Sequence, residues 1–108
     1  MARYLVQASY NPKGISDLVN NPQDRAVALR PVIEGMGGRI ESFDFAIGDY
    51  DVVAIFDVPD NVSAVALAMA IGSGGAMSAY KTTVLIPMDE AVEAMRKAGA
   101  SGYRPPGG

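Results

Sequence analysis

Apolar and polar residues follow two different periods along this chain. Four segments either alternate or run almost entirely apolar over a short length, and they are predicted as β-strands: residues 3–10, 40–47, 50–58 and 77–86. Three segments repeat apolar residues at steps of three and four, and they are predicted as helices: residues 15–36 with an interruption at 20–22, residues 62–71, and residues 87–97. The predicted order is β-α-β-β-α-β-α.

Several local signals refine these boundaries. Residues 11–14, Asn-Pro-Lys-Gly, have the composition of a turn. We expect Asn21 to cap a helix that has Pro22 at its first position and ends at the following glycine pair. Pro31 removes a backbone donor inside that helix and is expected to kink it. The alternation of the second strand changes phase near Glu41, which predicts a β-bulge there.

Two β-α-β halves joined by a hairpin indicate an α+β, ferredoxin-like fold. This arrangement, βαββαβ, has an antiparallel four-stranded sheet with its helices on one face. The last predicted helix is an addition at the C-terminal end. We assign residues 1–98 to the domain and the Gly- and Pro-rich residues 99–108 to a tail.

The third strand is apolar on both faces, which a two-layer domain does not explain. Val52, Ala54 and Phe56 share one face, whereas Val53 and Ile55 lie on the other. A small monomer rarely leaves such a patch in water. A second copy of the chain, with the sheets stacked in a homo-oligomer, is the economical cover. The alternative is that the last helix or the tail folds over the sheet.

Composition narrows the classes of function. The net charge is −3 with the basic residues scattered, which argues against nucleic acid and membrane surfaces as partners. The chain has no Cys and no His, so zinc–thiolate sites, thiol nucleophiles and His-based catalysis are excluded. We therefore predict neither a metal nor a cofactor. The N-terminal residues lack the features of a signal peptide, and a cytoplasmic protein is expected.

A short motif between the second and third strands resembles a known family. Gly48-Asp49-Tyr50-Asp51, followed by an apolar strand and Val58-Pro59-Asp60, is similar to the signature from which the GYD domain family takes its name. Gly72-Ser73 and Lys81-Thr82-Thr83 agree with it in order, and the resemblance covers residues 3–96. It implies a ferredoxin-like, dimeric α+β-barrel type of protein. It implies no particular biochemical role.

Polar side chains beside the buried strands are the candidate ligand-binding residues: Gln7, Ser9, Asp44, Tyr50, Asp51 and Lys81. Several share a polar phase and are expected on the open sheet face. There, stacked subunits would enclose a mostly apolar pocket with a few polar groups. Tyr80 is an alternative to Lys81, since the phase of the fourth strand is undecided. Asp51 has a second, purely structural interpretation, in which its carboxylate only accepts hydrogen bonds from backbone N–H groups.

Two functions are consistent with these residues. The first is a homo-oligomeric module that binds a small organic ligand or regulates in response to one. The second is a cofactor-independent isomerase, lyase or oxygenase. In it Asp51 or Asp44 is the base and Tyr50 or Lys81 stabilises an enolate. A carboxylate inside a closed cavity, within reach of a Tyr or Lys, would distinguish the enzyme.

Overall fold

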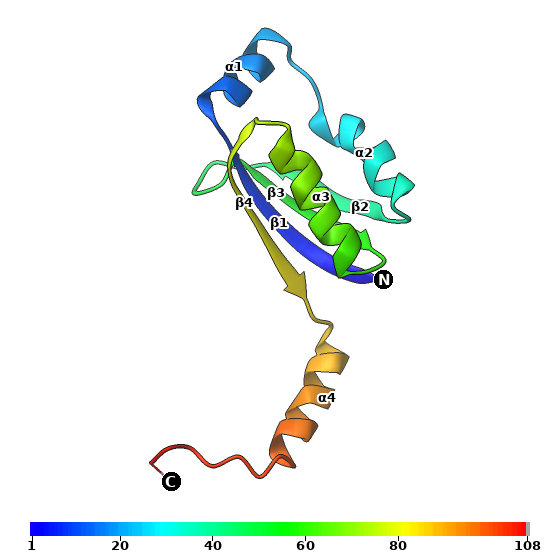
Figure 1. Cartoon of the computed structure of the whole chain (residues 1–108), viewed down its shortest axis with the longest axis vertical. Coiled ribbons are helices and arrows are strands. Elements are labelled where there is room, and N and C mark those ends of the chain that lie inside the picture. Colours follow the sequence, from blue (N-terminus) through cyan, green and yellow to red (C-terminus); the bar gives the residue numbers. More distant parts are fainter. Residues whose placement is uncertain (108) are drawn as a thin grey trace.

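The computed structural model describes residues 1–107 of the chain (Figure 1). Its elements follow the order β1 (Ala2–Tyr10), α1 (Pro12–Asn20), α2 (Arg25–Gly35), β2 (Arg39–Phe45), β3 (Val52–Val58), α3 (Asn61–Ser73), β4 (Met77–Leu85) and α4 (Met88–Gly99). The predicted order is confirmed, with one refinement: the first helical region is two separate helices.

The four strands form one antiparallel sheet in the order β2-β3-β1-β4. α3 crosses one face of this sheet, α2 lies beside it, and α1 lies near the end where β1 leaves the sheet (Figure 1). We call this side of the sheet the helix face and the other side the open face. The architecture is the predicted α+β, ferredoxin-like one.

The predicted bulge in β2 is confirmed. Ile40 pairs with Phe56 and Ser42 pairs with Ile55, so the register shifts by one residue at Glu41. Because side chains alternate along a strand, the extra residue places both Ile40 and Phe43 on the helix face. Both side chains pack against the main core cluster there.

The predicted start of the second helix was wrong. Asp24, not Asn21, caps α2, and its carboxylate accepts hydrogen bonds from the N–H groups of Ala26 and Val27 at 2.8 and 3.4 Å. Asn21 instead closes α1, because its N–H donates to the carbonyl of Asp17 at 2.9 Å. A carboxylate that meets two free N–H groups is a stronger N-terminal signal than an Asn beside a proline.

Residues 11–14 do not form the expected turn. The Asn11 side chain accepts a hydrogen bond from the N–H of Gly14 at 2.8 Å, so Asn11 caps α1 and Pro12 occupies its first turn. A turn and a helix start share the same residue preferences, which explains the ambiguity. Pro31 lies inside α2, as predicted, and the kink expected there stays a prediction.

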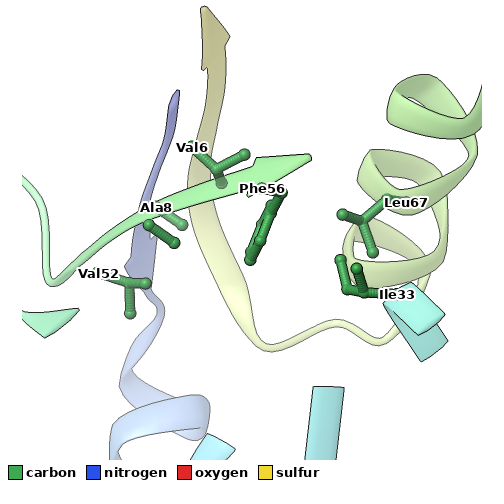
Figure 2. Packing of buried hydrophobic residues seen from close by; sticks show 7 residues of the cluster. Val6, Ala8, Ile33, Val52, Phe56 and Leu67 are labelled. Carbon is green, nitrogen blue, oxygen red and sulfur yellow. The ribbon is translucent and has the colours of Figure 1, made fainter. Parts of the chain in front are cut away.

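The core lies between the sheet and the helices. Phe56 is 2% exposed on β3, and it faces Leu67 of α3 and Ile33 of α2 (Figure 2). Val6 and Ala8 of β1 continue this layer. The two faces predicted for the third strand are confirmed, since its even-numbered residues are all buried, and Asp57 is the one odd-numbered residue of β3 that is buried as well.

α4 extends away from the rest of the fold (Figure 1). The longest dimension is 59 Å, and the radius of gyration is 17.7 Å. A compact chain of this length has a radius of gyration of about 13 Å. The excess comes from the C-terminal helix and the residues that follow it.

Candidate functional site

A cavity of about 470 Å³ lies on the helix face, between the sheet and helices α1, α2 and α3. Its floor is formed by core residues of the sheet: Val6, Ala8, Val52 and Phe56. Leu18, Leu29 and Ile71 contribute apolar walls from the three helices. The walls are therefore mostly apolar, and each helix supplies part of them.

Small residues explain why this space remains open. Ala8, Ala70 and Gly74 line the cavity where larger side chains would fill it. At one end α1 approaches the beginning of β4 closely. A Cβ at Gly14 would stand 2.5 Å from the carbonyl oxygen of Ala76, and that oxygen accepts a hydrogen bond from the N–H of Asn11 at 2.9 Å. Glycine at position 14 thus allows the contact that closes this end.

Tyr80 of β4 brings a polar group to the apolar wall. Its hydroxyl is buried and has no hydrogen-bond partner among the described residues. Burial raises the pKa of Tyr80 to about 12, so the phenol is neutral at physiological pH. An unsatisfied buried hydroxyl costs about 1–3 kcal/mol. Among the described residues that line the cavity, Tyr80 thus contributes a buried polar atom that lacks a hydrogen-bond partner.

Polar side chains also line the cavity on α1 and at the start of α2. Asp17, Gln23 and Arg25 are exposed residues that contribute to its lining. The Arg25 guanidinium donates a hydrogen bond to the Gln23 side chain at 2.6 Å. Burial raises the pKa of Tyr10, while the charge of Arg25 opposes this effect. Arg25 and Asp17 therefore place one charge of each sign at the solvent side of a mostly apolar space.

The structure brings three of the predicted site residues into one row on the open face, which is where polar residues of this phase were expected. Asp44 pairs with Val53, Val53 with Gln7, and Gln7 with Lys81, so the row crosses all four strands. Ser9 follows two residues after Gln7 on the same face. None of these predicted residues is among those that line the cavity.

The remaining predicted residues lie in the hairpin between β2 and β3. The Asp51 carboxylate accepts a hydrogen bond from the N–H of Tyr10 at 3.0 Å, and the Asp51 N–H donates to Ala8 at 2.9 Å. The Ser9 hydroxyl donates to the carbonyl of Asp49 at 3.4 Å. Tyr50 is half-buried beside them. These bonds tie the hairpin to β1, and they match the backbone-acceptor interpretation of Asp51.

Sequence reasoning missed the helix-face cavity. Tyr80 was considered only as an alternative to Lys81 on the open face. The pairing of Tyr80 with Ala8 assigns it to the helix face instead, and Lys81 to the open face. The available signal was weak: alanines at positions 8, 70 and 76 face a common space only once the strands and helices are packed.

The described part of the chain contains no group of three or more acidic, His or Cys side chains arranged to hold a metal ion. None of the helices in residues 1–107 combines the length and apolarity needed to cross a bilayer.

Comparison with known proteins identifies a family. The model of the GYD domain matches residues 4–95 of this chain. The match includes the whole sheet except the first residues of β1, and most of the helices. No curated protein and no solved structure matches the chain. Because the family model matches most of the 108 residues, the chain belongs to the GYD domain family.

Proposed function

We propose that this chain is a homo-oligomeric small-molecule-binding module whose ligand occupies the cavity on the helix face. The ligand is mostly apolar and carries a hydrogen-bonding group, such as a carbonyl or hydroxyl, that meets Tyr80. The mostly apolar cavity, with the unpartnered side chain of Tyr80 in its wall, is the observation that carries this proposal.

The dimensions of the cavity support a small organic ligand. Its volume of about 470 Å³ falls within the range of about 300–1,000 Å³ typical of ligand pockets. Such pockets combine apolar walls with a few polar groups that orient the ligand. Tyr80 is the buried polar group here, and Arg25 offers a charge toward solvent.

The chemistry of the lining favours binding over catalysis. Of the carboxylates considered as bases, neither Asp44 nor Asp51 lines the cavity. Asp17 does, but it is exposed, and it pairs with Lys13 at 2.9 Å on the surface of α1. A carbon acid bound beside Tyr80 would therefore lack a buried base.

Self-association through the open face is the second part of the proposal. Leu5, Val53, Ile55 and Leu85 are half-buried on that face, which the helices of the described chain leave uncovered. Stacking two sheets there would remove these side chains from water. The apolar free energy gained is about 25 cal/mol per Å² buried.

The ligand part is tested with 8-anilinonaphthalene-1-sulfonate, a fluorescent probe that brightens in apolar sites. We expect saturable binding of one probe per chain. Ala70→Phe, which fills the cavity from α3, should abolish it. Ala28→Phe, at an exposed position of α2 outside the lining, is the matched control and should bind the probe normally. Equal binding to both variants would refute the site.

The role of Tyr80 is tested with two probes of similar size that compete with the dye. Acetophenone has a carbonyl group and ethylbenzene has none. The wild-type protein should prefer acetophenone, and Tyr80→Phe should lose this preference, since each hydrogen bond contributes about 0.5–1.5 kcal/mol. The same substitution should raise the free energy of unfolding of the empty protein by about 1 kcal/mol, since it removes an unsatisfied group. A preference that survives in Tyr80→Phe would contradict the proposed contact.

A further inference from the structure

Two helices expose apolar stripes that the rest of the described chain does not cover. On α3 the stripe consists of Val62, Val65 and Met69, which are 78%, 52% and 69% exposed. On α4, Met88 and Met95 are 71% and 61% exposed, and Val92 lies between them. Exposed aliphatic side chains at these steps normally mark a helix–helix contact.

The stripe of α3 is separate from the contact that this helix makes with its own sheet. Ala64 and Leu67 are the buried residues of α3, and they point to the core. Because a helix turns 100° per residue, Val62, Val65 and Met69 lie on the opposite side. α3 is thus apolar on two sides, although its own fold uses one.

α4 has no partner for its stripe within the described structure. It begins three residues after the end of β4, and Pro87 just before it is extended, with φ −58° and ψ 147°. The helix leaves along the direction of β4 and packs on none of the other elements to any extent (Figure 1). A helix of 12 residues is marginally stable alone in water. The described fold therefore leaves the apolar side of α4 without a packing partner.

We propose that α4 of one copy packs against the outer stripe of α3 of a second copy, as an exchanged arm. The proposal rests on the self-association suggested above, but not on the ligand cavity.

The two stripes are complementary in spacing and in length. Apolar residues follow steps of three and four on α3, and of four and three on α4, as at the seam of paired helices. The helices have 13 and 12 residues, so each is about 18–20 Å long.

The charges of the two helices also suit this pairing. Within its 13 residues α3 carries no charged side chain, and the small side chain of Ala66 flanks its stripe, which lets a second helix approach closely. The charged residues of α4, such as Glu93 and Arg96, are exposed and have room to stay in water. The contact would bury apolar groups without burying an unpaired charge.

This contact is distinct from the stacking of open faces. The outer side of α3 faces away from the sheet, whereas the open face is the far side of that sheet (Figure 1). One chain therefore offers two separate surfaces for self-association, and a substitution can disrupt either one without affecting the other.

The absence of cysteine permits a direct test. Full-length Met69→Cys and Met95→Cys chains are prepared separately, mixed, and oxidised with copper–phenanthroline. We expect a disulfide-linked two-chain product from the mixture, because α3 of one copy meets α4 of another. Met69→Cys mixed with Ala94→Cys is the matched control, since Ala94 lies on α4 away from the stripe. That control should give little product.

Other arrangements give different products and would overturn the proposal. Met69→Cys that cross-links efficiently by itself would indicate pairing between two α3 helices. A double variant that closes into a single-chain disulfide at high dilution would indicate that α4 folds back on its own α3. In a third outcome, the native mass shows an oligomer while the mixture gives no two-chain product. That result would refute the contact between α3 and α4, but not the stacking of the open faces.

A second measurement does not depend on cross-linking. Met95→Glu lies on the protruding helix and should leave the folded domain and dye binding intact. It should raise the dissociation constant of the assembly at least tenfold by sedimentation or native mass. Ala94→Glu is the control and should leave that constant unchanged. Equal constants for Met95→Glu and the wild type would contradict the proposed contact.

Discussion

The two faces of the sheet differ in what covers them, and β3 contributes apolar side chains to both. Val52, Ala54 and Phe56 are at most 4% exposed on the helix face, where they build the core and the cavity floor. Val53 and Ile55 alternate with them and remain half-buried on the open face. Neighbouring residues with similar side chains thus differ in what they contribute. One set stabilises the monomer, and the other is available to a second copy.

Charge distinguishes the faces as well. The open face carries an ionic cluster at one end of the sheet. There the Asp57 carboxylate lies 2.6 Å from Nε of Arg39 and 4.0 Å from Nε of Arg3, and Arg3 also pairs with Glu41 at 2.8 Å. The side chain of Asp57 is only 6% exposed, and one of its oxygens has no hydrogen-bond donor among the described residues. The helix face has an unpartnered neutral phenol, whereas the open face has a partly satisfied charge.

The largest expected effect on stability is a difference between substitutions at two adjacent residues of β3. Phe56→Ala should lower the free energy of unfolding by about 3–5 kcal/mol, because it leaves a cavity in the core. Ile55→Ala should cost the monomer much less, yet it should weaken self-association if the sheets stack. Denaturant unfolding at low concentration and native mass at high concentration measure the two quantities. Equal losses of unfolding free energy at both positions would contradict the inference that only the helix face stabilises the monomer.

A smaller effect is expected in the ionic cluster. Arg39→Met removes the donor that lies 2.6 Å from Asp57 and leaves a buried carboxylate with poorer compensation. Arg39 is itself mostly exposed, so we expect a loss of about 1.5–3 kcal/mol, the range for a hydrogen bond to a charged group. Arg30→Met, at an exposed site on α2, is the control and should change stability by less than about 0.5 kcal/mol. A stability equal to that of Arg30→Met would show that the cluster contributes nothing.

The sequence was sufficient for the fold because its signals are local. Alternation or a short apolar run located the four strands, the phase change near Glu41 located the bulge, and the Asp60 cap located α3. The starts of α1 and α2 were misplaced, since Asn11, Asn21 and Asp24 all favour caps and turns. Which of them caps a helix depends on the N–H groups that the folded backbone presents.

The cavity could not be predicted from the sequence, and the reason is physical. It depends on how far three helices stand from the sheet, and this distance is set by packing between residues remote in the chain. Part of the open-face row was within reach, because Gln7 and Asp44 follow from the phase of their strands, whereas the choice between Lys81 and Tyr80 stayed open. Tyr80 required the register of β4 against β1, which no local pattern specifies.

Gly14, at one end of the cavity, tests how closely the helix face is packed, and its substitution should lower the free energy of unfolding by about 1 kcal/mol or more. Gly14→Ala would place a methyl group 2.5 Å from the carbonyl oxygen of Ala76, so it should destabilise the fold and open that end. Gly35→Ala, in α2 with free space around its Cβ position, should instead stabilise by about 0.4–1 kcal/mol. Thermal unfolding measures both. A stabilised Gly14→Ala would show that α1 is not held against β4.

The effect that is absent at neutral pH tests whether Tyr80 is buried as described. Its pKa is about 12 in the folded chain, above about 10 in an unfolded one, so the neutral phenol is favoured by folding. The resulting stability is fully present below pH 10 and is lost as pH rises from about 10 to 12. The difference in unfolding free energy between Tyr80→Phe and the wild type should therefore be flat at neutral pH and grow in favour of Phe above pH 10. Tyr103→Phe, at a 78% exposed position, is the control and should show no such growth. A flat difference for both variants would mean that the Tyr80 hydroxyl reaches water, and the polar anchor of the proposed site would be lost.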